Sequence, residues 1–267
     1  MALLRAAIKN CLALLAVMLA LAAPGQAATF SMKRGISLDN WVTWPPEDKW
    51  GDADVILPFP EWRRTVDGTA LKALKADGFD FVRMPVDPAP LMSDAAAGLR
   101  DRLFADVLQS VRLANAAGLK VLVDLHTIPW GDDRSVSTEK LLTDPALFER
   151  YLDMLRRMAS TLSAEDPQRV ALEIFNEPTS GCGADDRAWP ELAKRLFAAA
   201  RASATRLTLV IPGACWGDAE GLSRLDPAEF PDRNLIWSFH SYAPFLISHQ
   251  GADWAGDVAT YAAGIPY

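Results

Sequence analysis

Short apolar runs alternate with longer amphipathic segments along this chain, and this alternation constrains the fold more than any other feature. Six runs are apolar at most positions, as parallel strands covered on both faces must be: KRGISL, FDFVRMPV, LKVLVDLH, VALEIFNE, LTLVIPGA and NLIWSFHSY. Helical spacing predicts helices between them, at residues 70–76, 99–117, 145–162 and 189–205. Gly78 and Gly118 each follow a helical pattern and predict a helix end. This order predicts an α/β fold.

Two architectures use such units, an open doubly wound sheet and an eightfold barrel. An open sheet that binds a dinucleotide has a Gly-rich turn after its first strand, whereas this chain has LDNWVTWPP there. Polar or aromatic side chains follow every predicted strand instead. Because the carboxyl ends of many strands supply the chemistry of a barrel, we expect a (β/α)8 TIM barrel with about the first six βα units in this chain.

The first 28 residues have the three-part pattern of a secretory signal peptide. Arg5 and Lys9 precede an apolar run at residues 11–22, and the small-residue stretch APGQAA follows. The run is too short to span a bilayer. We therefore expect cleavage after Ala27 or Ala28, a secreted or periplasmic protein, no stable membrane insertion and one domain over residues 29–267. A retained N-terminal anchor is the alternative.

Net charge bears on which macromolecules the protein can bind, and the cysteines bear on whether it forms a disulfide. Without Arg5 and Lys9 the chain has 25 basic and 34 acidic side chains, a balance of −9. With no basic cluster, this balance makes nucleic acid an unexpected partner, and we expect a monomer. Cys182 and Cys215 follow the adjacent fourth and fifth strands. In an exported chain they predict a disulfide, although two buried thiols would also fit.

The stretch ALEIFNEPTS at residues 171–180 begins as a buried strand and ends in Asn176, Glu177 and Pro178. Pro178 cannot continue a ladder and disfavours helical backbone at Glu177. A carboxylate is therefore expected at the mouth of the sheet. Taken alone, this stretch also fits a solvated acid at a strand end.

Five segments together resemble glycoside hydrolase family 5, the cellulase-like family: RGISLDNW, FDFVRMPVDP, VLVDLHTIP, LEIFNEP and WSFHSYAPFLISHQGADW. The resemblance runs from about Lys33 to the last residue. Asn-Glu-Pro alone is a weak motif, but the joint order on successive strand ends is specific. The resemblance implies a (β/α)8 barrel that hydrolyses β-linked glycans with retention of configuration through two glutamates.

The resemblance also implies residue roles. Glu177 would be the general acid/base, Asn176 would contact the sugar 2-hydroxyl, and a supporting shell of the cleft would comprise Arg83, His126, His240 and Tyr242. An acid that stays protonated near neutral pH needs a raised pKa, which burial beside another carboxylate would supply. Arg83 could instead, or in addition, pair with Glu173 for structural reasons.

Two further alternatives concern the histidines and the tryptophans. His126 and His240 could be core histidines or, with Glu177, metal ligands, although no metal-binding spacing is present. Five tryptophans follow strands, where a ring could stack on a pyranose, and we expect two or three of them to touch substrate: Trp41, Trp44, Trp130, Trp216 and Trp254.

The resemblance places the nucleophile on a glutamate at the end of a seventh strand, but no glutamate follows Glu229. We therefore assign no nucleophile and expect a fragment of a longer enzyme that lacks activity by itself. The expected function of the complete protein is retaining hydrolysis of β-linked glucans, without cofactor or metal. The alternatives are a non-catalytic glycan-binding protein of barrel origin and a metal-dependent barrel hydrolase.

Overall fold

The structure is a computed structural model that describes residues 29–39, 41–58, 66–128, 134–183, 185–252 and 255–256. The predicted signal peptide lies outside these residues, as do Trp130 and Trp254. None of the helices over the described residues combines the length and the hydropathy that a membrane span requires.

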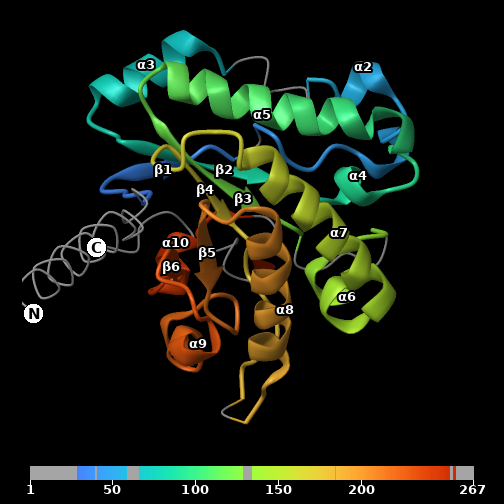
Figure 1. Cartoon of the computed structure of the whole chain (residues 1–267), viewed down its shortest axis with the longest axis vertical. Helices are drawn as coiled ribbons and strands as arrows, with labels where there is room; N and C mark the ends of the chain where they lie inside the picture. The colour runs from blue at the N-terminus through green and yellow to red at the C-terminus, as the bar shows by residue number, and fades with distance from the viewer. Residues whose placement is uncertain are drawn as a thin grey trace, which may run out of the picture.

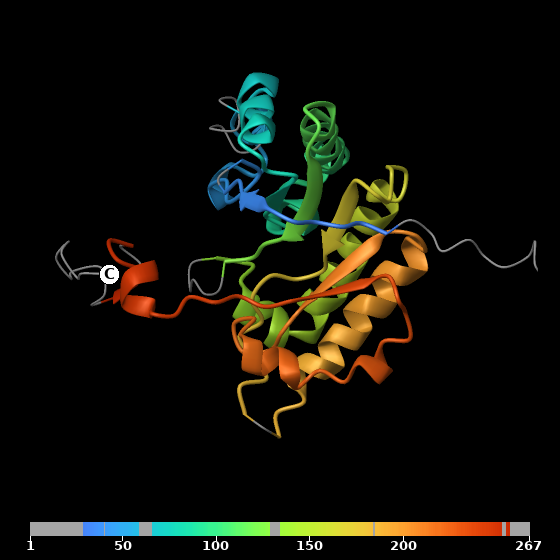
Figure 2. The same cartoon turned by 90° about the vertical axis from the view of Figure 1, so that its left-hand side faces the viewer.

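The described chain forms one curved sheet of six parallel strands in the order of the sequence (Figures 1 and 2). The strands are β1 (Gly35–Ser37), β2 (Phe81–Val86), β3 (Lys120–Leu125), β4 (Val170–Glu173), β5 (Thr208–Pro212) and β6 (Leu235–Ser238). All six predicted strands are confirmed. Sequential parallel neighbours in a curved sheet are the arrangement of a (β/α)8 barrel, of which the described residues form six strands.

The four long helices match the predicted ranges to within a few residues: α3 (Gly68–Ala76), α5 (Arg100–Ala116), α7 (Pro145–Leu162) and α8 (Ala188–Ser203). Asp67 and Asp144 cap α3 and α7 by accepting hydrogen bonds from backbone N–H groups of the first turn. Gly78 and Gly118 have φ of +90° and +89°, as helix-ending glycines do, and confirm that prediction.

Short helices occupy the connections. They are α2 (Ala53–Ile56), α4 (Ala89–Met92), α6 (Thr138–Thr143), α9 (Ala219–Ser223) and α10 (Phe245–Ser248), with 3₁₀ turns η1 (Glu47–Lys49), η3 (Ala97–Leu99) and η4 (Pro227–Glu229). Such elements are too short to show a helical period in the sequence. Helix α10 follows β6 and projects away from the long helices (Figure 2).

The two faces of the sheet have different cores. Alternate residues of β3, such as Val121 and Val123, pack with the long helices in the main hydrophobic cluster. Leu122 points to the other, inner face, where Phe30 packs against it in a small cluster with Ala171 and Val210. The inner face therefore has an apolar layer, and the next inward-facing residues along the strands form the polar layer that builds the site.

Candidate active site

The polar layer begins with two carboxylates side by side on the inner face. Asp124 on β3 and Glu173 on β4 are register partners, and both are almost fully buried. Two neighbouring buried carboxylates repel each other unless a cation lies between them. The sheet therefore needs a positive charge at this level.

Arg83 on β2 supplies this charge. Its Nε donates to Glu173 Oε2 at 2.8 Å, and its Nη2 lies 2.9 Å from Asp124 Oδ2. Burial opposes the charged forms, but the two carboxylates raise the pKa of Arg83 and the arginine helps to hold the pKa of Asp124 below its ordinary value. Ser238 on β6 donates to the second oxygen of Glu173 at 3.0 Å. The predicted Arg83–Glu173 pair is confirmed, and it is part of a wider network.

The same network fixes the orientation of Asn176 and the proton of His126. Arg83 Nη2 donates to Asn176 Oδ1 at 2.7 Å, so Asn176 Nδ2 faces His126 Nε2 at 3.1 Å. An amide nitrogen only donates, so Nε2 must accept. The proton of the neutral ring therefore sits on Nδ1, 2.6 Å from Asp124 Oδ2. Asn176 is held by Arg83 and His126 before any ligand binds.

Glu177 lies beyond the end of β4 with its side chain only 16% exposed. His240 Nδ1 and the Tyr242 hydroxyl both contact its Oε1, at 2.5 and 2.7 Å. No described residue donates a hydrogen bond to Oε2. One oxygen is therefore anchored from the segment after β6, and the other is left for a ligand.

The protonation of Glu177 differs from the expectation. Burial raises its pKa, but the hydrogen bonds from His240 and Tyr242 outweigh burial and hold the pKa below the ordinary value for glutamate. A raised pKa would require a second carboxylate beside Glu177, whereas the main groups acting on it here are His240, Tyr242 and His126. The expected raised pKa is therefore corrected to a lowered one for this chain.

The five tryptophans predicted to follow strands differ in their burial. Trp41 is 1% exposed in the main hydrophobic core, which corrects its predicted role, because a buried ring offers no face to a sugar. Trp44 is half-buried and contacts the His126 ring edge-on, with centroids 5.2 Å apart. Trp216 is half-buried in the turn after β5. Predictions for Trp130 and Trp254 lie outside the described residues.

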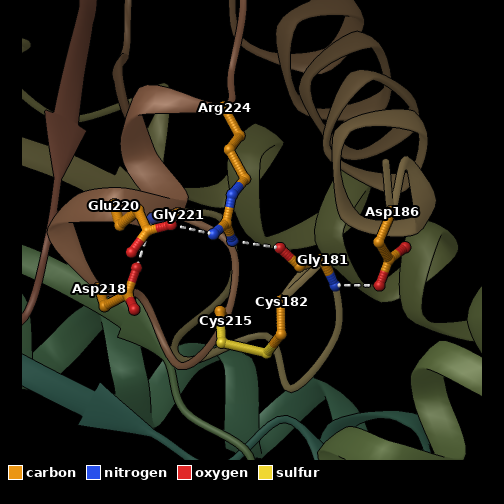
Figure 3. The surroundings of a disulfide bond; sticks show 8 residues. All are labelled: Gly181, Cys182, Asp186, Cys215, Asp218, Glu220, Gly221 and Arg224. Carbon is orange, nitrogen blue, oxygen red and sulfur yellow. Dashed lines mark hydrogen bonds and ion pairs between the residues drawn. A yellow bond between two sulfur atoms is a disulfide. The ribbon is translucent and has the colours of Figure 1, made fainter. Parts of the chain in front are cut away.

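The structure forms the predicted disulfide between Cys182 and Cys215 (Figure 3). The bridge joins the loop after β4 to the loop after β5, so it connects the segment that carries Glu177 to the neighbouring strand end.

Two groups near the network were not singled out from the sequence. Ser238 closes the network from β6, and its Ser-Phe-His context gave no distinguishing signal. Asp87 follows β2 and is 2% exposed; its Oδ1 accepts from the N–H of Ala89, while its Oδ2 has no hydrogen-bond partner among the described residues and lies 3.9 Å from Nη1 of Arg134. Burial raises the pKa of Asp87 to about 6. Its position directly after a strand was the available clue.

His249 lies beside the site but turns toward its own segment. It stacks on Phe245 with centroids 3.7 Å apart and contacts the Tyr242 ring at 5.0 Å. Across the described ranges, no group of three or more His, Cys, Asp or Glu side chains is placed to hold a metal ion.

A curved sheet of sequential parallel strands, with an oriented amide and an anchored carboxylate at the strand ends, defines the class of (β/α)8-barrel proteins. Within that class, the sequence model of one family, Cellulase (glycosyl hydrolase family 5), matches residues 52–263. The match covers most of the chain, and the chain belongs to glycosyl hydrolase family 5.

Individual relatives agree with this assignment. The chain is 24% identical over 238 residues to Endoglucanase C of Acetivibrio thermocellus, covering 89% of this chain and 65% of that protein. It is 25% identical over 189 residues to Cellodextrinase A of Ruminococcus flavefaciens, covering 70% of this chain and 54% of the relative. The chain thus spans less than two thirds of the length of these relatives.

Solved structures give the same fold. Thermotoga maritima Cel5A in complex with mannotriose superposes with a TM-score of 0.65 at 25% identity, over 88% of this chain and 70% of that one. The Clostridioides difficile cellulose synthase subunit Z has a TM-score of 0.66 at 22% identity, over 86% of this chain and 67% of that one. The latter likeness concerns the fold alone.

Proposed function

We propose that the protein is a retaining glycoside hydrolase that cleaves β-linked glucans, with Glu177 as its general acid/base. The observation that carries the proposal is the anchored carboxylate: Oε1 of Glu177 is held by His240 and Tyr242, and Oε2 has no donor among the described residues. Family membership supports the reaction class. The names of the relatives, endoglucanase and cellodextrinase, support the substrate class.

The geometry suits both steps of a retaining mechanism. In the first step, Glu177 would protonate the leaving glycosidic oxygen through Oε2 while a second carboxylate attacks the anomeric carbon. In the second step, Glu177 would take a proton from the water that releases the sugar. The preset Asn176 amide would donate to the 2-hydroxyl, whose hydrogen bond strengthens as the oxocarbenium-like state forms.

The second carboxylate is not assigned to a described residue. Asp124 and Glu173 each form an ion pair with Arg83, and both carboxylates are buried. A carboxylate used as a nucleophile must approach the anomeric carbon, with the two carboxyl groups about 5 Å apart. We propose that this group comes from a part of the protein that the described residues do not include.

The lowered pKa of Glu177 follows from the same proposal. His240 and Tyr242 donate to Glu177, and no carboxylate of a described residue is among the main groups acting on its pKa, so Glu177 favours the ionised form. A carboxylate brought close would raise the pKa of Glu177 by like-charge repulsion and would compete for the Tyr242 hydroxyl. The protonated, acid-ready form of Glu177 therefore depends on the second carboxylate.

The test introduces Glu177→Gln into the full-length protein, produced in its source organism. The kinetics of the variant and the parent are then compared on a soluble β-1,4-glucan. We expect kcat to fall by about 10²- to 10⁴-fold, as loss of a general acid/base does. Binding of the glucan should stay close to that of the parent. Glu149→Gln is the matched control, because Glu149 pairs with Arg195 on the surface, and its kcat should not change.

Three results would separate the alternatives. Unchanged turnover by Glu177→Gln would contradict the assigned role. Glucan binding without turnover by the parent would favour a non-catalytic binding protein. Loss of turnover with a chelator, restored by a divalent metal, would favour the metal-dependent hydrolase.

We also propose that the protein is exported and that its signal peptide is removed by cleavage after Ala27 or Ala28. The Cys182–Cys215 disulfide supports this proposal, because such bonds persist in oxidising compartments. Sequencing the amino terminus of the protein recovered from the periplasm or the medium tests it. A mature chain that begins at Ala28 or Thr29 is the expected result, and an intact Met1 on membrane-bound protein would contradict it.

A further inference from the structure

The turn after β5 has an unusual backbone. Cys215, Trp216 and Gly217 have consecutive φ values of 51°, 64° and 71°. Only glycine adopts this left-handed region freely, so Cys215 and Trp216 are held there at a cost in free energy. Such a conformation persists only where surrounding contacts determine it, which raises the question of what holds this turn.

Four contacts tie the turn and its helix to the loop after β4. The N–H groups of Cys215 and Trp216 donate to the carbonyls of Ser180 and Pro178, at 2.8 and 2.7 Å. The disulfide joins Cys215 to Cys182 (Figure 3). Arg224, which follows α9, donates to the carbonyl of Gly181 at 2.8 Å. The bridge is the covalent member of this set.

The same turn supports the proposed acid/base. The carbonyl of Gly217 accepts the backbone N–H of His240 at 2.7 Å, and the His240 ring contacts Glu177. A Cβ at Gly217 would lie 3.7 Å from that ring and 3.9 Å from Glu177 Cγ. A closed circuit therefore runs from Glu177 through Pro178 to the turn, on to His240, and back to Glu177.

We propose that the Cys182–Cys215 disulfide is a positioning clamp for the Glu177–His240 pair. By fixing the left-handed turn, the bridge holds the Gly217 carbonyl where it anchors His240 against Glu177. The role of the pair in catalysis rests on the proposed function, whereas the clamp itself is a statement about geometry. When a dithiol reductant converts the bridge to two thiols and is itself oxidised to a disulfide, the His240–Glu177 hydrogen bond loosens.

The bridge is placed so that a reductant can reach it. Cys182 is exposed and Cys215 is half-buried, whereas Gly181 beside Cys182 is buried against the β5 loop. Thiol–disulfide exchange requires access of a thiolate to one of the sulfurs. The exposed Cys182 provides that access without unfolding of the core.

The experiment is NMR of the full chain in three forms: oxidised, reduced with dithiothreitol, and Cys182→Ser/Cys215→Ser. The side-chain carboxyl carbon of Glu177, assigned by its loss in Glu177→Gln, is titrated with pH. The downfield proton between His240 and Glu177 is followed as a second signal. Neither reading depends on glycan hydrolysis, so failure of the clamp and failure of the proposed function are distinguishable.

We expect the apparent pKa of Glu177 to rise by about half a pH unit or more when the bridge opens, because a donor to the carboxylate is weakened. The downfield proton should broaden or vanish in both bridge-free forms, while the circular dichroism of the fold is kept. Unchanged signals in a protein with two titratable thiols would overturn the proposal. If the double variant does not fold, the signals of the parent reduced with dithiothreitol test the proposal by themselves.

Arg224→Ala is the matched control, since it removes another contact between the same two loops. The clamp predicts a smaller shift for Arg224→Ala than for opening the bridge. An equal or larger shift would mean that the loops are held by general packing and would also overturn the proposal.

Discussion

The centre and the carboxyl-terminal edge of the sheet contribute to one site but are held in different ways. At the centre, every residue of β4 is buried, and Asp124 and Glu173 share Arg83. At the edge, every residue of β6 is only half-buried, and Phe239 and Tyr242 after it are 54% and 46% exposed. Within the described residues the central carboxylates both pair with Arg83, although Asp124 Oδ1 accepts no hydrogen bond, whereas β6 at the edge pairs only with β5.

Glu177 lies between these regions, and this position explains its properties. Its backbone follows a buried central strand, while both donors to its carboxylate come from the exposed edge. The centre therefore sets where the carboxylate lies, and the edge sets its protonation. A structural element added beyond β6 would act on the second property more than on the first.

The largest effect is expected from breaking the central network. Asp124→Ala removes the buried carboxylate that the half-buried Arg83 and His126 share, so the free energy of unfolding should fall by about 3 to 5 kcal/mol. Urea denaturation of the full chain measures this loss. Glu149→Ala, which breaks a surface pair with Arg195, should cost less than about 1 kcal/mol. Similar losses in the two variants would remove the contrast between a central network and an exposed surface.

The next largest loss of stability is expected from removing the disulfide that joins the loop after β4 to the loop after β5. Cys182 and Cys215 are 33 residues apart, and a bridge over such a loop stabilises by about 3 to 4 kcal/mol in the chain-entropy treatment. Cys182→Ser/Cys215→Ser should therefore lower the urea midpoint. A midpoint equal to that of the parent would show that the bridge adds no stability.

Replacing Asp87 is expected to raise the stability of the fold in a pH-dependent way. Its folded pKa of about 6 exceeds the ordinary value of 3.8, so the folded state binds more protons between these pH values and stability falls as pH rises through that window. Asp87→Asn removes this cost, which is at most about 3 kcal/mol above pH 6. Unfolding curves at pH 4 and 7.5 should show a gain only at the higher pH. A gain of the same size at pH 4 would contradict the assigned cause.

The smallest change in stability is expected from replacing Glu177. Its folded pKa is lowered, so its ionised form contributes stability above the ordinary glutamate pKa, and this contribution is lost as pH falls through the folded value. Glu177→Gln should destabilise by about 1 kcal/mol near pH 7. The difference should shrink in acid. A difference that stays constant from pH 3 to 7 would show that the carboxylate charge is not involved.

Much of the architecture could be predicted because it depends on local patterns. Six apolar runs became six strands, and the long helices follow their spacing because each buries one continuous face. The two cysteines could be paired because parallel strands place successive strand ends side by side. These inferences require only neighbouring elements.

The remaining features depend on contacts between distant residues. The lowered pKa of Glu177 comes from His240 and Tyr242, which lie 63 and 65 positions away. Trp41 follows a strand, as a cleft residue would, but the core covers its ring. The sequence shows that these groups occur at strand ends, but their burial and spacing emerge only in the folded structure.

Azide rescue of Glu177→Ala in the full-length protein, with an aryl β-cellobioside as substrate, tests the role of Glu177 most directly. An activated leaving group needs no acid, so the glycosyl-enzyme should still form and await a nucleophile. If Glu177 is the acid/base, azide should accelerate turnover and yield a β-glycosyl azide. No rescue, or an α-glycosyl azide, would contradict the assignment of Glu177 as the acid/base of a retaining glycosidase.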